Sequence, residues 1–150
     1  MTDQIQTSVL EIKRVSKTTQ GKKRIRFTAL VAVGDKQGQV GIALGKAPSV
    51  AAAVQKAVNK AKKDMIKVPV TKWFSVPHRV EVKQDAVFVL IKPAPKGTGI
   101  KAGSVTRSIL ELAGYQNVVA KILGSSNKNA GAYATMQALS MLKPVKQRRL

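Results

Sequence analysis

The chain has 150 residues, enough for one ordinary domain or two small ones. Its 27 Lys and Arg against 7 Asp and Glu give a formal net charge of +20, so most of the positive charge must face outward. Cysteine is absent, which excludes disulfides, thiolate metal sites and a cysteine nucleophile. The longest apolar runs fall far short of the ~20 residues of a membrane span, and we expect no signal peptide.

The charge itself indicates a class of partner. A surplus of this size repels itself in a compact chain unless a polyanion screens it. Nucleic acid fits best, because each Lys or Arg placed against a phosphate releases counterions. A membrane surface would need a basic helix with bulky apolar residues, whereas the one strongly basic helix here is lined with Ala and Val. Aromatic residues make up only 4% of the chain, which argues against a base-stacking surface.

The first half of the chain predicts an antiparallel meander followed by a helix. Residues 1–8 are expected to be frayed, and the predicted strands are 9–17, 27–33 and 39–44. A turn at 18–21 and a loop at 34–38 connect them. A helix opens at Pro48, with a proline in its first turn.

Two sets of residues recur at helical spacing in that helix. The expected buried stripe comprises Val50, Val54, Ala57, Val58, Ala61 and Met65. A second face carries Lys56, Lys60, Lys63 and Lys67. The helix is therefore expected to pack on the sheet and to expose ammonium groups. Phosphate contact and a merely solvated face are both open for these lysines.

Prolines at 69 and 77 mark a change of unit near residue 72. The strands predicted beyond it are 79–83, 86–92 and 118–122. The predicted helices are 104–113, stopped by Gly114, and a last one from the 124–127 cap to about residue 142. We predict an α+β chain with domains at 9–72 and 73–143, and flexible tails at 1–8 and 144–150.

Candidate catalytic features are weak. His78, the only histidine, stands in an extended segment without an acidic residue within two positions, which is typical of a surface or interface residue. Residues 97–102 fit a loose G-x-G-x-x-G/A pattern, but Pro93–Lys96 prevents the tight turn of a dinucleotide site. The glycine amides there, beside Lys96 and Lys101, could still hold a phosphate. Residues 124–126 resemble a metabolite-kinase phosphate loop, although helix capping is favoured. We expect no catalytic residues, metal, cofactor or small-molecule substrate.

Positive charge is concentrated between residues 13 and 34, which hold no acid. The basic residues are Lys13, Arg14, Lys17, Lys22, Lys23, Arg24 and Arg26. A basic hairpin tip can contact RNA phosphates, and Gly21 permits close approach of the backbone. A solvated edge strand that discourages aggregation is the alternative, but it explains one or two charges rather than seven.

Many short segments resemble one family, small-subunit ribosomal protein S5 of the bacterial type, in the right order over about residues 9–142. In the first half they are 14–18, 27–30, 33–35, 45–47 and 56–57. In the second half they are 97–100, 102–103, Arg107, 110–111, 113–114, 117–118, Lys121 and 134–135.

The resemblance implies a first domain like a double-stranded-RNA-binding fold without its leading helix. It implies a second domain of three strands, a helix, a strand and a helix, with a left-handed crossover. It also implies a ribosomal location, cytoplasmic or organellar. Family members bind rRNA near the neck of the small subunit, contact ribosomal proteins S4 and S8, and line the channel by which mRNA enters, where they influence decoding accuracy.

The resemblance and the charge together indicate the site residues. Those expected at RNA are Lys13, Arg14, Lys17, Thr18, Gly21, Lys22, Lys23, Arg24, Arg26, Lys46, Lys56, Lys60 and Lys63. Those expected to face S4 are Gly97, Gly99, Lys101, Gly103 and Arg107. Two other functions remain open: a free double-stranded-RNA-binding regulator that uses the first domain, and a metabolite kinase that uses the glycine loops.

Overall fold

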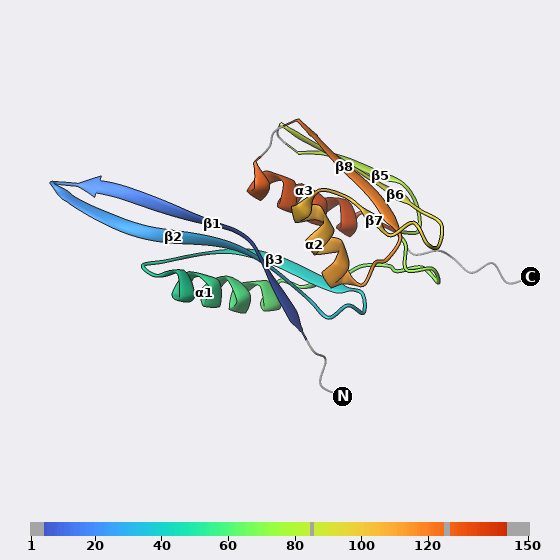
Figure 1. Ribbon diagram of the computed structural model, residues 1–150, viewed down its shortest axis with the longest axis horizontal. Coiled ribbons are helices and arrows are strands. Elements are labelled where there is room, and N and C mark those ends of the chain that lie inside the picture. Colours follow the sequence, from blue (N-terminus) through green and yellow to red (C-terminus); the bar gives the residue numbers. More distant parts are fainter. Residues whose placement is uncertain (1–4, 85, 125–126, 144–150) are drawn as a thin grey trace, which may run out of the picture.

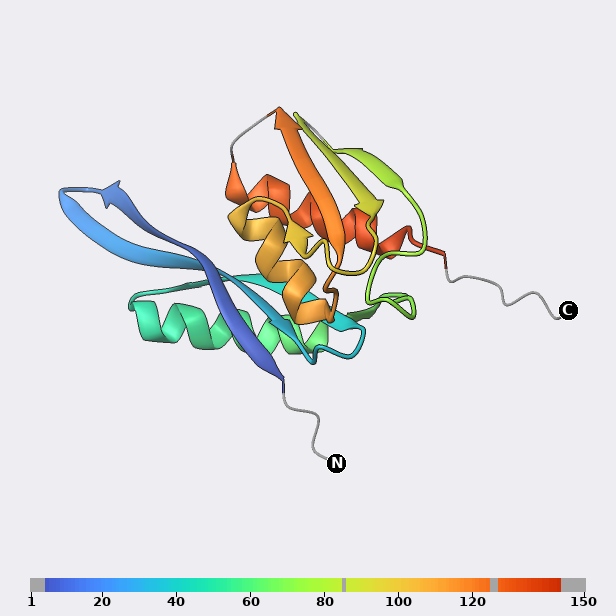
Figure 2. The same cartoon turned by 45° about the vertical axis from the view of Figure 1, so that its right-hand side comes forward.

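The computed structural model describes residues 5–84, 86–124 and 127–143. Two four-stranded sheets and three helices make up this part of the chain, which confirms the α+β prediction. Figures 1 and 2 show four layers: a helix, the first sheet, a pair of helices and the second sheet. A long two-stranded hairpin projects beyond these layers.

The first sheet has the order β1-β2-β3-β4, and every neighbouring pair in it is antiparallel. The strands are β1 (Gln6–Thr19), β2 (Lys22–Gly34), β3 (Gln39–Ala47) and β4 (Ile66–Lys67). The helix α1 (Val50–Lys63) covers one face of this sheet. The strand-first meander and its helix agree with the fold that the resemblance implied.

Helix α1 packs unusually close to β3 because two strand positions lack side chains. A Cβ on Gly45 would lie 2.3 Å from the carbonyl oxygen of Ala53, and one on Gly41 would lie 2.5 Å from that of Ala61. Only small residues fit on the helix at this separation. The buried positions of α1 are Ala53, Ala57 and Ala61.

Several details of the first half differ from the sequence prediction. Val50 is 37% exposed, since the stripe centres on the alanines instead of the larger residues. Val54, Val58 and Met65 flank the core cluster and are half-buried. The helix begins one residue after Ser49, whose hydroxyl accepts a hydrogen bond from the Ala52 N–H. Lys67 belongs to β4, so it does not extend the lysine stripe of α1.

The expectation of frayed residues 1–8 is wrong for residues 6–8. They belong to β1 and pair with residues 32–34 of β2. The other expected tail, 144–150, lies outside the described residues.

The second sheet has the order β5-β6-β8-β7. Its strands are β5 (Val80–Gln84), β6 (Val87–Pro93), β7 (Ile100–Lys101) and β8 (Val118–Gly124). β7 and β8 are parallel and joined by α2 (Ser104–Ala113), and α3 (Lys128–Ser140) follows β8. This confirms the expected run of three strands, a helix, a strand and a helix. The handedness of the crossover stays a prediction.

One hydrophobic core spans both sheets. Leu30 and Ile42 of the first sheet belong to the same buried cluster as Ile91, Ile109 and Leu139. Helix α2 contacts β2 and β3 as well as β7 and α3, so it lies between the sheets. The two halves are therefore packed against each other, while the boundary proposed near residue 72 stays a prediction.

Candidate nucleic-acid interface

The basic hairpin forms an arm beyond the end of the first sheet. The pairing of β2 with β3 ends at Phe27 and Ala47, so residues 15–26 have only each other as strand partners; we call them the arm (Figure 1). Its turn is Gln20–Gly21, and both residues have positive φ, as a two-residue hairpin loop requires. Thr18 lies in β1 and not in the turn, contrary to prediction. A Cβ on Gly21 would meet nothing within 4 Å, so the tip is open to close approach.

Strand register sorts the basic residues of the arm onto two faces. Because successive side chains alternate, residues paired across the strands share a face. Lys13 of β1, Thr28 of β2 and Lys46 of β3 are paired in one row across the three strands. The next pair on the same face, toward the tip, is Val15 and Arg26. The next residue of β2 on this face is Arg24, whereas Arg14 pairs with Phe27 on the other face.

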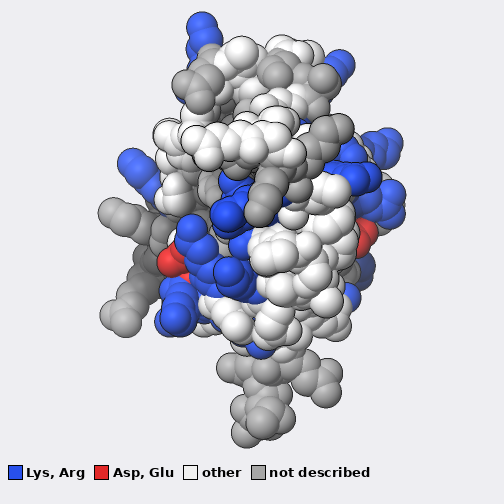
Figure 3. Space-filling view, turned by 90° about the vertical axis from the view of Figure 1, so that its left-hand side faces the viewer, with Lys and Arg blue, Asp and Glu red and all other residues white. Residues whose placement is uncertain are grey.

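We call Lys13, Arg24, Arg26 and Lys46 the cationic face; all four residues are exposed. Glu11 lies 3.6 Å from the Lys13 ammonium. Among the described residues, the other three members form no ion pair. Figure 3 looks at the molecule from the arm's end, and Lys and Arg far outnumber Asp and Glu in that view. Within the described residues, the protein therefore compensates Lys13 alone among the four members of the cationic face.

The lysines of α1 lie on the opposite side of the first sheet. β2 alternates between Ala29 and Val31, which pack against α1, and Leu30 and Ala32, which belong to the core shared with the second sheet. Residues 24 and 26 share the side of Leu30. Lys56, Lys60 and Lys63 are exposed on α1. They lie on the opposite side of the sheet from the cationic face, although the Lys56 Nζ donates to the backbone carbonyl of Lys46 at 3.5 Å. The last turn of α1 also gains from its lysines, because positive charge is favourable at a helix C-terminus.

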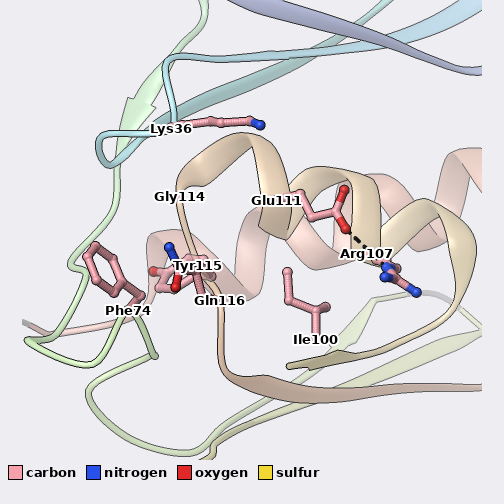
Figure 4. Close-up of a pocket in the computed structure, with 8 residues that line it drawn as sticks. All are labelled: Lys36, Phe74, Ile100, Arg107, Glu111, Gly114, Tyr115 and Gln116. Atoms are coloured by element: carbon pink, nitrogen blue, oxygen red, sulfur yellow. Dashed lines mark hydrogen bonds and ion pairs between the residues drawn. The ribbon is translucent and has the colours of Figure 1, made fainter. Parts of the chain in front are cut away.

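The five residues expected to face a protein partner follow one another from the 93–99 loop into α2. Gly103 is the N-terminal cap of α2, and Lys101 is exposed in β7. The Arg107 Nε lies 3.0 Å from a Glu111 oxygen on the exposed side of the helix. Beside them, a pocket of about 400 Å³ opens between α2, the β2–β3 turn and residues 114–116 (Figure 4).

The idea that glycine amides of this loop hold a phosphate is wrong. The N–H groups of Gly97 and Gly99 both donate to the buried side-chain oxygen of Asn117, at 3.0 and 3.2 Å. The Asn117 amide nitrogen donates in turn to the Trp73 carbonyl at 2.8 Å. Sequence reasoning missed this role, because nothing local distinguishes Asn117 from other polar residues before a strand.

The remaining candidate for catalysis has a structural role. The His78 Nε2 accepts a hydrogen bond from the Lys143 N–H, and its Nδ1 lies 2.9 Å from the Arg79 carbonyl oxygen. His78 thereby fixes the chain just after α3 to the start of β5. The motif at 124–126 falls partly outside the described residues. Within the described ranges, no three His, Asp or Glu side chains gather as metal ligands, and no helix has the length and apolarity to cross a membrane.

Comparison with known proteins finds a family match in each half of the chain, and the two matches are to two domains of one family. Residues 5–69 match the family described as ribosomal protein S5, N-terminal domain. Residues 82–149 match the family described as ribosomal protein S5, C-terminal domain.

Individual relatives carry related names. The chain is 48% identical over 138 residues to small ribosomal subunit protein uS5 of Thermosynechococcus vestitus, covering 92% of this chain and 79% of that protein. It is 44% identical over 142 residues to protein uS5c of Cyanophora paradoxa, covering 95% and 84%. The spinach uS5c is 44% identical over 141 residues, which are 94% of this chain but only 46% of the spinach protein.

Proposed function

Since the chain belongs to the ribosomal protein S5 family, whose members are structural, non-enzymatic proteins of the small ribosomal subunit, we propose that its arm binds small-subunit rRNA. The observation that carries the proposal is the cationic face. Its members Arg24 and Arg26 are exposed on the narrow two-stranded element that projects from the body, and neither has a carboxylate partner among the described residues.

The chemistry of this face suits the RNA backbone better than the bases. Lys and Arg contact phosphates whatever the sequence, and each contact releases counterions. The arm carries no exposed aromatic side chain among its described residues. We therefore propose that it follows the shape of the RNA and its phosphates, near the neck as the resemblance implies.

The lysines of α1 form a second proposed contact. Lys56, Lys60 and Lys63 belong to α1, which covers the side of the first sheet opposite the cationic face, and Lys56 also donates to the Lys46 backbone carbonyl. Both sets can bind RNA at once only if two rRNA segments lie on opposite sides of the sheet. This arrangement supports a protein that holds segments of rRNA together.

The segment from Gly97 to Arg107 is proposed to contact ribosomal protein S4, as the resemblance implies. Its exposed Arg107–Glu111 pair and the neighbouring pocket offer polar groups and a recess to a partner. We also propose that the protein contacts ribosomal protein S8. It would lie at the channel by which mRNA enters and would affect decoding accuracy, as the resemblance implies.

Sedimentation of a tagged copy in a sucrose gradient tests this function. We expect the chain in the small-subunit fractions, retained at moderate salt and released by ribonuclease. A chain that stays at the top of the gradient, with solubility unaffected by ribonuclease, would contradict the proposal. A free double-stranded-RNA-binding regulator would instead bind naked duplex tightly and sediment alone.

A further inference from the structure

The segment that joins the two sheets exposes two adjacent aromatic side chains. Trp73 is 50% exposed and Phe74 is 47% exposed, and Trp73 is the only tryptophan of the chain. Figures 1 and 2 place this segment far from the tip of the arm. Adjacent exposed aromatic side chains mark a contact surface more often than single ones do.

Hydrogen bonds fix the backbone that holds these rings outward. Phe74 has a φ of +57°, in the left-handed region that bulky residues avoid. Its N–H donates to the Thr71 carbonyl at 2.9 Å, and its own carbonyl accepts from the N–H groups of Gln116 and Asn117. The Trp73 carbonyl is bound by the Asn117 side chain. The hydrogen-bonded backbone of this turn therefore holds both side chains toward solvent.

Two ammonium groups flank the indole. The Nζ atoms of Lys72 and Lys96 lie 5.6 and 5.3 Å from the centroid of the Trp73 ring. Lys96 belongs to the loop that Asn117 fixes through Gly97 and Gly99. Because Asn117 also binds the Trp73 carbonyl, it positions both the indole and one of the two lysines. Neither lysine has a carboxylate partner in the part of the chain that the structure describes.

We propose that Trp73 stacks on an unpaired RNA base while Lys72 and Lys96 contact the flanking phosphates. Proteins that bind single strands combine an aromatic face with nearby positive charge, and every base offers a face to stack on. Exposed contacts between lysine and an aromatic ring are weak, so a base can displace them. Protein interfaces are also rich in Trp and Phe but are depleted in lysine, so the two lysines favour RNA as the partner.

The chain's single tryptophan makes the proposal directly measurable. Short unstructured oligo(A) added to the whole chain is expected to quench Trp73 fluorescence saturably, whereas a duplex containing the same strand leaves it unchanged. The double variant Lys72→Ala/Lys96→Ala should need more oligo(A) for half-quenching and lower the salt slope by about 1.4, at about 0.7 per phosphate. A bound strand without quenching, or an unchanged half-quenching concentration, would overturn the proposal.

A second comparison removes the contribution of the arm. In a chain carrying Arg24→Ala and Arg26→Ala, Trp73→Leu should weaken oligo(A) binding about 5- to 150-fold, the range that loss of one stacked base produces. The matched control Tyr133→Leu replaces another exposed aromatic and should leave binding unchanged. Equal affinities of the Trp73 and Tyr133 variants would refute stacking, while binding by the arm is measured separately and stands on its own.

Cross-linking in assembled small subunits identifies the strand. A photoreactive phenylalanine analogue in place of Trp73 should cross-link to RNA, and subunits prepared with and without mRNA distinguish rRNA from mRNA. Cross-links to protein alone would show that the aromatic pair is a protein contact and would overturn the proposal.

Discussion

Gly34 of β2 and Leu112 of α2 bring the first sheet into backbone contact with that helix. A Cβ on Gly34 would lie 2.2 Å from the Leu112 carbonyl oxygen. Two hydrogen bonds stand beside this contact, from the Lys36 N–H to the Leu112 carbonyl and from the Gly38 N–H to the Ala113 carbonyl, each 2.9 Å. The β2–β3 turn is therefore fastened to the end of α2 by main-chain groups, which sets how the halves of the protein are placed.

Replacing Gly34 tests this contact. Gly34→Ala forces a methyl group into the Leu112 backbone, and we expect a loss of about 1–3 kcal/mol in the free energy of unfolding, as overpacking usually produces. Urea unfolding measures it. Gly103→Ala is the control, because its Cβ would meet nothing within 4 Å and its φ is −65°, so only the weaker helix cap that Ala provides lowers its stability. Equal stabilities of the two variants would show that β2 and α2 do not touch at Gly34.

We expect Asn117 to contribute strongly to the free energy of unfolding, because its one side chain binds three backbone groups. Asn117→Ala leaves the N–H groups of Gly97 and Gly99 and the Trp73 carbonyl without their partner, at an expected cost of about 1–3 kcal/mol. The emission of Trp73 should change in the folded variant because its turn is released. The exposed neighbour Gln116 provides the control: Gln116→Ala should stay within about 0.5 kcal/mol of the wild type. Unaltered emission in the Asn117 variant would contradict the assignment.

Tyr115 connects the halves through a buried hydroxyl, which donates to the Pro69 carbonyl at 2.7 Å. Burial raises the pKa of Tyr115 well above its usual value of about 10. Only the protonated form suits the folded state, so this stability is complete below pH ~10 and falls as the pH rises from there toward the folded-state pKa. Tyr115→Phe should cost about 0.5–1.5 kcal/mol at neutral pH.

Comparison with Tyr115→Phe isolates the contribution of the Tyr115 hydroxyl to the alkaline loss of stability. The stability difference between wild type and Tyr115→Phe should shrink above pH ~10. Tyr133→Phe, at an exposed tyrosine, is the control for removing a hydroxyl and should stay within about 0.5 kcal/mol of the wild type at neutral pH. A difference for Tyr115→Phe that does not change with pH would contradict a buried hydroxyl.

Local patterns predicted the regular elements well. Helix α2 has the predicted bounds, since Val105, Ile109 and Leu112 recur at helical spacing and Gly114 ends it in the left-handed conformation. The predicted stripe of α1 is right at Ala57 and Ala61, but it includes the exposed Val50 and omits Ala53, because bulky residues are the usual signal of a buried side. A glycine between Val40 and Ile42 in a strand was the signal for close helix packing. β4 and β7, of two residues each, are too short for any periodic pattern.

The candidate site needed tertiary information. The sequence shows seven basic residues around one hairpin, but which of them share a face depends on register, and a slip of one residue would exchange the faces. Similarly, the positive φ of Phe74 and the hydrogen bonds of Asn117 arise only when segments 18 or more residues apart meet. The sequence alone shows where along the chain the positive charge lies, and the structure shows which face of the sheet carries it.

The salt dependence of binding to small-subunit rRNA tests the central claim most directly. Arg24→Ala/Arg26→Ala should reduce the slope of log K against log salt by about 1.4–1.8, at about 0.7–0.9 for each phosphate no longer neutralised. Lys83→Ala/Lys121→Ala removes the same charge from exposed positions of the second sheet and should leave the slope unchanged. Equal slopes for wild type and both variants would contradict an arm that binds rRNA phosphates.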